Sequence, residues 1–522
     1  MNILSRWWIE FSVHQAHNSQ LASVGISYAN ATPKRTQNMN SNQEKEITRY
    51  FFDVSALHEY VRAFERYSGI QRVVATIIEH YLHIQGGENA YISFLERGFG
   101  RYKCIKLNDI DPLCFRSPAS LAAAMGKKGV DGTYLAPIAK YKSSRHKYLF
   151  HRLKFDVFAA LNMDRRFAKY NLNAKSWKEL RRPLPKLLES VEFLDFFDLA
   201  RPGDHLIVID SSWLPKHSEM FRKAKELGLE VHTFVYDLVP VIMPHVTAGN
   251  MPNMFYNALL DSINYTSGYI TISDSTKADL DKFLQNKGVD IPSRSLPLAQ
   301  EGLPSKMTDS STNTNDHLVN EQYDDYAHIA EVGALRDEIR SVATIPYVLC
   351  VGSIEPRKNG WRIANAWARL SELKGIEVPR LVFAGGSGWL RSEFDTFLEG
   401  TGNLNGWVQV VDRPTDIELA FLYRNCSFTI MASIYEGWGL PVGESLAYGK
   451  TAIVSNTTSL PEVGGNLVKY CDPNSIDSIE AACKELICQP EIRVELEEKI
   501  KSTNLRSWGD VSADLISILR AS

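Results

Sequence analysis

The sequence predicts an α/β protein built from two doubly wound, mostly parallel sheets. Two observations predict this class. Short, near-continuous apolar runs alternate with longer segments of helical periodicity along most of the 522 residues, which is the pattern of buried parallel strands joined by crossover helices. The alternation stops in one polar stretch and then restarts. Because a chain of this length is also too long for one ordinary core, we expect two domains.

The first domain is expected over residues 47–300, after a Ser-, Asn- and Gln-rich lead-in (1–46) that lacks large apolar side chains and is predicted to be disordered. Helical segments are expected at "GIQRVVATIIEHYL" (69–82) and "STKADLDKFLQ" (275–285). The strand candidates are "YFFDVS" (50–55), "YISFLE" (91–96), "HLIVID" (205–210), "VHTFVYDL" (231–238) and "YITISD" (269–274).

Residues 301–345 are polar, rich in Asp and Asn, and without periodicity, so we interpret them as a linker. The second domain is expected over 346–503, ends in a helical stretch from about 476, and is followed by a tail or helix (504–522). Its strand candidates are "YVLCVGS" (347–353), "RLVFAGG" (380–386), "VQVVD" (408–412), "SFTIMAS" (427–433) and "TAIVS" (451–455).

Composition excludes several classes. The net charge of -3, with 44% hydrophobic and 23% charged residues, is typical of a soluble protein with no overall attraction to nucleic acid. Seven cysteines without a C-x-x-C pair argue against a disulfide framework or a zinc site and favour a reducing, cytoplasmic location. No signal peptide is recognised in the first residues, and no stretch has the roughly 20 apolar residues of a spanning helix. We expect a soluble or peripheral protein.

One segment, 140–189, is strongly basic, with fourteen Lys and Arg against four Asp and Glu and with interleaved aromatic residues. A solvated helical face is one interpretation. A surface for an anionic membrane or acceptor is another, because a local basic excess attracts headgroups and phosphates. Nucleic acid is disfavoured, since no recognition motif accompanies the charge.

The most informative stretch is "SIYEGWGLPVGESLAYGK" (433–450), in which Glu436 and Glu444 bracket a loop with three glycines and an exposed-looking Trp438. Glycines allow a close approach of backbone N–H groups, and the following helix N-terminus adds partial positive charge, so the loop suits a phosphate or diphosphate. Carboxylates would then bind neutral hydroxyls. A diphosphate between two polyols describes a nucleotide sugar.

Other interpretations of this loop are open. The glycines alone fit an ordinary tight turn, and Glu444 alone fits an acid that complements a helix dipole. Two acids also fit a glycosidase pair, although nothing else in the sequence is typical of a hydrolase.

The segment 433–465 resembles the signature of the retaining glycosyltransferases of family 4, which have the GT-B fold. Glu436 and Glu444 match the family's E-x7-E motif, and "PEVGG" (461–465) matches as well. The resemblance covers most of 50–500, specifically in the C-terminal half and more loosely in the N-terminal half. Further matching segments are "YVLCVGSIEPRKNGWRIANAW" (347–367), "LVFAGGSGW" (381–389), "TDIELAFLYRNCSFTIMASIYEGWGLP" (415–441), "YSGIQRVV" (67–74), "FVYDLVP" (234–240) and "ISDSTKADL" (272–280).

The resemblance implies two Rossmann-like domains facing a cleft and a role for each matching residue. Glu444 would bind the ribose, Glu436 the hydroxyls of the donor sugar, and Lys358 with Arg357 would neutralise the departing diphosphate. The family reaction is described as a same-face displacement that needs neither a side-chain nucleophile nor a metal, so no cofactor is expected. The remaining donor-binding residues would be Gly437, Trp438, Gly439 and Leu440 of the loop, and Gly69 from across the cleft.

The sequence departs from the family pattern at two points. Ser353 stands where the family often has arginine, and Arg357 is expected to supply that charge. Tyr236–Asp237 stands where a His–Asp pair is common, which makes Tyr236 a weak substitute for the family histidine. Nearby His232 and His245 fit ordinary polar positions better.

Three further residues fit structural roles as well as functional ones. Asp53 and Asp210, at strand ends, could cap helices or contact an acceptor. "GSGW" (386–389) is expected to form a wall of the base site, with Trp389 packing rather than stacking.

The segments "EGWGLPVGES" and "EPRKN" resemble those of bacterial mannosyltransferases. This resemblance favours GDP-mannose as the donor. It also favours a lipid-linked saccharide acceptor in lipopolysaccharide, capsule or exopolysaccharide synthesis. The basic 140–189 segment would then lie at the inner membrane face. Alternatives are a UDP-sugar-dependent transferase of the same fold, a hydrolase or epimerase, a non-catalytic nucleotide-sugar-binding protein, and a membrane scaffold.

Overall fold

The structure is a computed structural model of the chain. It describes residues 48–64, 66–96, 100–126, 145–161, 163, 166–167, 177, 192–211, 215–303 and 335–521. The predicted lead-in (1–46) lies outside the described residues, as do most of the linker (301–345) and more than half of the basic segment (140–189). Residues Arg49–Ser212 and Glu219–Glu230 form one compact unit, here called the N-terminal unit, and Val231–Ser522 form the main part of a second, the C-terminal unit.

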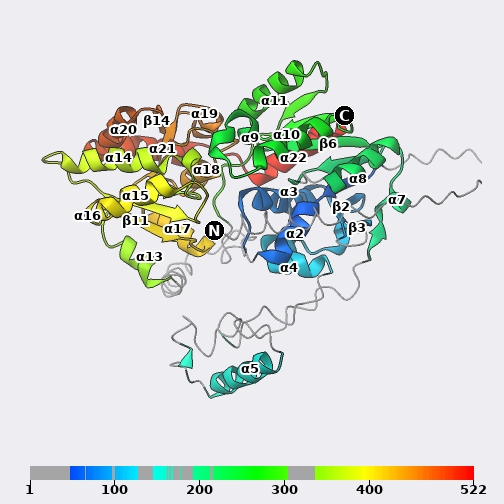
Figure 1. Cartoon of the computed structure of the whole chain (residues 1–522), viewed down its shortest axis with the longest axis horizontal. Helices are drawn as coiled ribbons and strands as arrows, with labels where there is room; N and C mark the ends of the chain where they lie inside the picture. The colour runs from blue at the N-terminus through cyan, green and yellow to red at the C-terminus, as the bar shows by residue number, and fades with distance from the viewer. Residues whose placement is uncertain are drawn as a thin grey trace, which may run out of the picture. The chain divides into compact units, whose positions relative to one another are not determined.

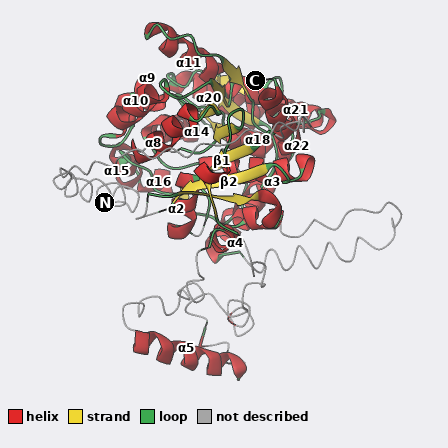
Figure 2. Cartoon of the chain, turned by 90° about the vertical axis from the view of Figure 1, so that its right-hand side faces the viewer, coloured by secondary structure: helices red, strands yellow, loops and turns green. Residues whose placement is uncertain are grey.

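Strands of the N-terminal unit lie in the order β4-β3-β2-β1-β5. β1 is parallel to both β2 and β5, and β1 and β2 lie side by side in Figure 2. β3 and β4 were not predicted. β3 is antiparallel to β2, because the short connection from Leu95 to Tyr102 permits a hairpin but no parallel crossover, and β4 is antiparallel to β3. The strands are β1 (Tyr50–Asp53), β2 (Ala90–Leu95), β3 (Tyr102–Lys106), β4 (Leu194–Asp195) and β5 (His205–Val208).

Helices of this unit cover the sheet with apolar faces. In α3, Val73, Val74, Ile77 and Ile78 are buried, which is the spacing of one helical face. The helices are α2 (Ser55–Ala63), α3 (Gly69–Gln85), α4 (Pro118–Ala124), α5 (Arg145–Ala160), α7 (Phe196–Leu199) and, with residues in both units, α8 (Pro215–Glu226).

The C-terminal unit has strands in the order β6-β7-β8 and a six-stranded sheet in the order β11-β10-β9-β12-β13-β14. All neighbouring strands of the six-stranded sheet pair in parallel. Each apolar run predicted as a strand between 347 and 455 contains one. The strands are β6 (Glu230–Val235), β7 (Gly268–Thr271), β8 (Ser293–Ser295), β9 (Tyr347–Val351), β10 (Arg380–Gly385), β11 (Val408–Asp412), β12 (Thr429–Met431), β13 (Ala452–Ser455) and β14 (Lys469–Cys471).

Helices of the C-terminal unit follow most strands, and α14 and α20 lie side by side (Figure 1). The chain ends in a helix, α22. None of the described helices is long and apolar enough to cross a membrane. The helices are α9 (Val239–Ile242), α10 (Met251–Ser262), α11 (Asp274–Asn286), α13 (Asp337–Val342), α14 (Gly360–Glu372), α15 (Ser392–Gly400), α16 (Gly402–Asn405), α17 (Asp416–Asn425), α18 (Leu440–Ala447), α19 (Leu460–Gly464), α20 (Ile476–Cys488), α21 (Pro490–Ser502) and α22 (Trp508–Arg520).

The six-stranded sheet brings two distant loops together. β12 pairs with β9 at Thr429 and Leu349, so the two strands are neighbours and run in the same direction. Their carboxyl ends therefore meet at one edge of the sheet, where ligands of open α/β sheets bind. The loop after β9 contains "EPRKN" and the loop after β12 contains "EGWG". Both predicted motifs thus lie at the same edge.

Candidate active site

Two glycines determine the shape of the loop between β12 and α18. Gly439, immediately before α18, has φ +113°, a conformation that side chains rarely adopt. A Cβ at Gly437 would lie 2.1 Å from the carbonyl oxygen of Tyr236, so only glycine lets the loop pack this closely against the chain after β6. Gly437 therefore serves the packing of this loop, and its predicted contact with a donor phosphate stays a prediction.

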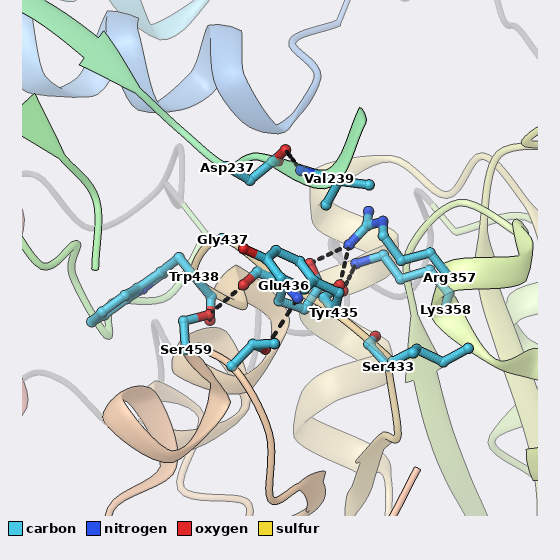
Figure 3. Close-up of polar contacts among 12 residues, drawn as sticks. Asp237, Val239, Arg357, Lys358, Ser433, Tyr435, Glu436, Gly437, Trp438 and Ser459 are labelled. Atoms are coloured by element: carbon cyan, nitrogen blue, oxygen red, sulfur yellow. Dashed lines mark hydrogen bonds and ion pairs between the residues drawn. The ribbon is translucent and has the colours of Figure 1, made fainter. Parts of the chain in front are cut away.

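Glu436 lies in this loop and binds two cations. Its Oε1 accepts a hydrogen bond of 2.7 Å from Lys358 Nζ, and its Oε2 lies 2.7 Å from Arg357 Nη1. Figure 3 shows both cationic side chains converging on the carboxylate. The Glu436 side chain is only 8% exposed, while those of Arg357 and Lys358 are 18% and 16% exposed. The three residues predicted as catalytic are therefore brought together.

The loop after β9 fixes the two cations. Asn359, with φ 62°, donates from its side chain to the carbonyls of Ala432 (2.8 Å) and Pro473 (2.7 Å), which ties the end of this loop to the edge of β12. A Cβ at Gly352 would lie 3.3 Å from Lys358 Cε, so the glycine after β9 leaves room for the lysine side chain. The position of Lys358 is therefore built into the loop.

Glu355 is a further member of this cluster that was not predicted from the sequence. Its Oε1 accepts a 2.7 Å hydrogen bond from Arg357 Nη2, while Arg357 Nη1 also donates to the carbonyl of Tyr435 at 2.8 Å. Glu355 is buried. Two cations are thus matched by two carboxylates. An acid two residues before the arginine was the available signal, but spacing alone does not show which way a loop side chain points.

Charge decides the protonation of Glu436. Burial disfavours the ionised carboxylate, but the positive charges of Arg357 and Lys358 outweigh it and lower the pKa of Glu436 to about 2. Burial likewise disfavours the charged form of Arg357, yet Glu436, Glu355 and Asp237 together raise the pKa of its guanidinium. Glu436 and Arg357 are therefore both ionised at neutral pH. Two fixed cations at the carboxyl edge of a parallel sheet, beside a helix N-terminus, can stabilise an anion.

About a third of the chain, including the Glu436 cluster, matches a known protein family. Residues 333–503 match the family model described as glycosyl transferases group 1. These residues form a glycosyltransferase group 1 domain. The family resemblance inferred from Glu436, Glu444 and the "EPRKN" loop is confirmed for this part of the chain.

Curated relatives of the chain are mannosyltransferases. The chain is 35% identical over 135 residues to the O-antigen chain mannosyltransferase B of Escherichia coli, covering 26% of this chain and 35% of the relative. It is 25% identical over 167 residues to the serotype-specific mannosyltransferase WbdA of Escherichia coli, covering 32% of this chain and 20% of that one. The chain thus spans about a third or less of the length of these relatives.

Among solved structures, HepE of Anabaena in complex with UDP and glucose is similar, with a TM-score of 0.51 and 11% identity over 91% of this chain and 100% of that one. At this identity the likeness concerns the fold alone. The predicted GT-B fold class is confirmed.

Glu444 of the group 1 domain lies on α18, is buried, and accepts a 2.7 Å hydrogen bond from the hydroxyl of Tyr423. The ring of Tyr423 stacks on that of Tyr448, with centroids 5.3 Å apart. Tyr423 was not predicted as a site residue, because it lies 21 positions away on another helix. The predicted contact of Glu444 with ribose stays a prediction.

Trp438 of the group 1 domain is buried, so its predicted exposure is wrong. It is 5% exposed, and its indole Nε1 donates to the carbonyl of Ala299 at 3.3 Å. In Figure 3 the indole extends to the opposite side from Arg357 and Lys358. The neighbouring glycines suggested an open loop, but the loop is packed. Leu440 is the first residue of α18, and the donor contacts predicted for Trp438, Gly439 and Leu440 stay predictions.

Asp237 adjoins the cluster from the segment after β6. Burial raises the pKa of Asp237, and the positive charge of Arg357 opposes that rise. Its carboxylate accepts a 3.0 Å hydrogen bond from the backbone N–H of Val239. Tyr236 is buried beside it, and a functional replacement of the family histidine by Tyr236 stays a prediction. His232 is buried in β6, whereas His245 is an exposed residue of a short 3-10 turn.

The "PEVGG" segment has a structural contact that the sequence did not indicate. The carboxylate of Glu462 accepts 2.8 Å hydrogen bonds from the backbone N–H groups of Asp274 and Ser275, the first two residues of α11. A carboxylate at this position caps the helix and complements its dipole. Trp389 Nε1 donates a hydrogen bond to the carbonyl of Val246 at 2.7 Å, and the predicted packing of Trp389 in a wall of the base site stays a prediction.

The remaining candidates belong to the N-terminal unit. Gly69 is the first residue of α3, and its predicted position opposite the donor diphosphate stays a prediction. Asp210 accepts hydrogen bonds from the backbone N–H groups of Leu57, in the first turn of α2, and Ser211. Asp53 accepts from the hydroxyls of Ser55 and Tyr102, both at 2.7 Å. The contact of Asp210 with α2 favours its capping interpretation over acceptor binding, whereas the hydroxyl contacts of Asp53 favour neither interpretation.

Proposed function

We propose that the chain is a retaining glycosyltransferase that moves mannose from GDP-mannose onto a saccharide acceptor, lipid-linked, in bacterial lipopolysaccharide, capsule or exopolysaccharide synthesis. The observation that carries the proposal is the buried Glu436 held by Arg357 and Lys358 inside a group 1 domain. The mannosyltransferase names of the curated relatives support the choice of sugar.

Each residue of the cluster has one task in the proposed reaction. Arg357 and Lys358 neutralise the diphosphate while the bond between its oxygen and the anomeric carbon breaks, which stabilises charge that develops in the transition state. The acceptor hydroxyl attacks the same face of the sugar, and its proton passes to the departing phosphate. Glu436 orients the sugar hydroxyls and Glu444 binds the ribose.

Donor binding must then exchange ion pairs. Without donor, both cations are already bound to Glu436, and Arg357 is also bound to Glu355. A diphosphate that approaches Lys358 competes with the carboxylate for the same N–H groups. Glu436→Gln is therefore expected to bind GDP about tenfold more tightly, because the diphosphate no longer competes with a carboxylate for one charged hydrogen bond. The same variant is expected to transfer sugar about 10²–10³-fold more slowly, because the carboxylate that orients the sugar is lost.

A UDP-sugar donor is the second candidate. It is favoured by the similarity in fold to HepE, which was solved with UDP and glucose and with UDP-glucose. The base and sugar are selected by contacts of a few side chains, which the shared fold leaves free to vary.

The test is a donor screen by thermal shift and by release of nucleoside diphosphate. It compares GDP-mannose, UDP-glucose, UDP-galactose and UDP-N-acetylglucosamine on the wild type, Glu436→Gln and Glu444→Ala. The matched control is Glu495→Gln, an exposed acid of α21 paired with Lys499. We expect a shift with GDP-mannose that Glu444→Ala loses and the control retains, with GDP release stimulated by membrane extract.

The alternatives give different results. A shift with one UDP-sugar alone supports the second candidate. A shift without turnover in the presence of any acceptor identifies a binding protein, and no shift in folded protein contradicts the transferase proposal altogether. Turnover that is unchanged by EDTA supports metal independence, and an anomeric proton signal of the product with the configuration of the donor supports retention.

A further inference from the structure

Helix α5 (Arg145–Ala160) is the longest described part of the basic segment, and it is drawn in Figures 1 and 2. Its sixteen residues include four Lys or Arg and a single Asp. The helix belongs to the N-terminal unit and contributes no residue to the group 1 domain. Its side chains therefore call for an explanation that the proposed transfer reaction does not supply.

One face of α5 is already occupied. Phe155 and Ala159, one turn apart, are buried, and the ring of Phe155 lies 5.1 Å from that of Trp177. Phe167 joins the same aromatic cluster. Trp177 Nε1 donates a 2.8 Å hydrogen bond to Asp156, which satisfies the only acid of the helix. This face holds α5 against its local surroundings.

A second face of α5 exposes large apolar side chains. Leu149, Leu153 and Val157 follow one another at intervals of four residues and are 47%, 65% and 47% exposed. Phe150 and Leu161 widen this stripe and are 65% and 66% exposed. At about 100° per residue, the five residues cover one continuous third of the helix surface. Such a contiguous apolar stripe marks a contact surface rather than a solvated helix face.

Two lysines border one edge of the apolar stripe. Lys147 and Lys154 are seven residues apart and adjoin the edge formed by Phe150 and Leu161, whereas Arg152 lies about 60° beyond Leu149, with Asp156 between them. Lys154 Nζ also lies 5.7 Å from the centre of the Phe158 ring. An apolar stripe bordered by cations is the pattern of a helix that lies in a membrane interface.

We propose that α5 binds the surface of an anionic lipid bilayer, with the Leu149–Leu161 stripe in the acyl boundary and Lys147, Lys154 and Arg152 among the headgroups. Charge complementarity favours this occupant, because the cations border the apolar stripe where a bilayer presents its phosphates. A second copy of the helix would bring like charges together. A nucleic acid would leave the aliphatic side chains in water. The inference stands independently of the transfer reaction.

The experiment is flotation of the full chain with vesicles of phosphatidylcholine alone and of phosphatidylcholine mixed with phosphatidylglycerol, at low and high salt. We expect binding to the mixed vesicles, weakened by salt because screening reduces the attraction. Lys147→Gln with Lys154→Gln lowers the partition coefficient about 25-fold, since each cation near an anionic surface contributes about fivefold. Leu153→Glu lowers it at least about tenfold through lost apolar burial.

Matched control variants distinguish vesicle binding by α5 from non-specific binding by other parts of the protein surface. Val494→Glu replaces a 52% exposed valine of α21, and Lys282→Gln removes an exposed lysine of α11; both are expected to bind vesicles like the wild type. Phe150→Ser is a second apolar variant, and an unchanged circular dichroism spectrum and melting temperature check the folding of each.

Three results would overturn the proposal. One is the absence of wild-type binding to the mixed vesicles, and another is undiminished binding of both Leu153→Glu and Phe150→Ser. The third is a dimer, detected by sedimentation equilibrium without lipid, that Leu153→Glu dissociates. That result would assign the stripe to a second copy of the chain.

Discussion

Glu436 in the C-terminal unit and Asp210 in the N-terminal unit are both buried carboxylates that follow a parallel strand, yet they bind protons very differently. Burial disfavours ionisation of both. Two cations overcome it at Glu436 and lower its pKa to about 2, whereas Asp210 has only backbone and hydroxyl donors and the nearby Asp53, and its pKa rises to about 7. Burial alone therefore does not identify a charged site; the partners do.

The difference separates a candidate binding site from a helix cap. The cations beside Glu436 remain partly exposed, so they can exchange the carboxylate for another anion. The donors to Asp210 include the backbone N–H groups of Leu57 and Ser211, which are fixed by the fold and cannot move to another anion. We therefore expect changes at Glu436 to alter ligand binding and changes at Asp210 to alter only stability.

The largest effect on stability is expected when the guanidinium of Arg357 is removed. Arg357→Met leaves both Glu436 and Glu355 without a guanidinium and lowers the free energy of unfolding by about 5 kcal/mol, the upper end of the cost of breaking a buried ion pair. Denaturant unfolding measures it. The control Arg369→Met removes a half-exposed arginine paired with Asp477, and its cost should be far smaller because an exposed ion pair contributes little to stability. An equal loss of unfolding free energy in both variants would show that burial of the Glu436 cluster does not strengthen its ion pairs.

The second effect concerns Asp210. Its folded pKa, about 7, lies above the ordinary 3.8, so the native state retains a proton that the unfolded state loses, and stability falls as pH rises between these values. The fall amounts to about 4 kcal/mol at most. Asp210→Asn cannot ionise and should lack this slope, whereas Asp111→Asn, an exposed helix cap, should keep it. Parallel stability–pH curves for wild type and Asp210→Asn would contradict the assignment.

The third effect has the opposite sign. The folded pKa of Glu436, about 2, lies below the ordinary 4.5, so its ion pairs contribute stability above pH 4.5 that is lost as pH falls toward 2. The contribution is about 3 kcal/mol. Glu436→Gln should show that much less acid destabilisation than the wild type, measured by denaturant unfolding at a series of pH values. Glu495→Gln is the control, and an acid limb unchanged by Glu436→Gln would mean that other carboxylates carry it.

The smallest effect sharpens the comparison within the C-terminal unit. Tyr423→Phe removes the hydroxyl that donates to Glu444 and should raise the KM for the donor about fivefold, for about 1 kcal/mol of lost orientation, with kcat nearly unchanged. Steady-state kinetics measure it. Tyr470→Phe, whose hydroxyl donates to the Gly465 carbonyl at the surface, should leave KM unchanged. A fall in kcat alone would place Glu444 in the chemical step instead of donor binding.

Much of the fold could be predicted because parallel strands and their helices have local signatures. The apolar runs at 347–353 and 427–433 contain β9 and β12, and the helical period at 69–82 falls within α3. The antiparallel β3 and β4 were missed. β4 has only two residues, too few to show any alternation.

The sequence by itself identified the candidate site residues: Glu436, Glu444, Arg357 and Lys358 were predicted from their match to the family motifs, and their roles in the transfer stay predictions. Only the tertiary structure decided their partners. Glu436 meets Lys358 across 78 positions of sequence, Glu462 caps α11 across 188, and Trp438 is buried although glycines surround it. The physical reason is that local sequence fixes backbone conformation and periodicity, whereas contacts between loops depend on which strands become neighbours in the sheet.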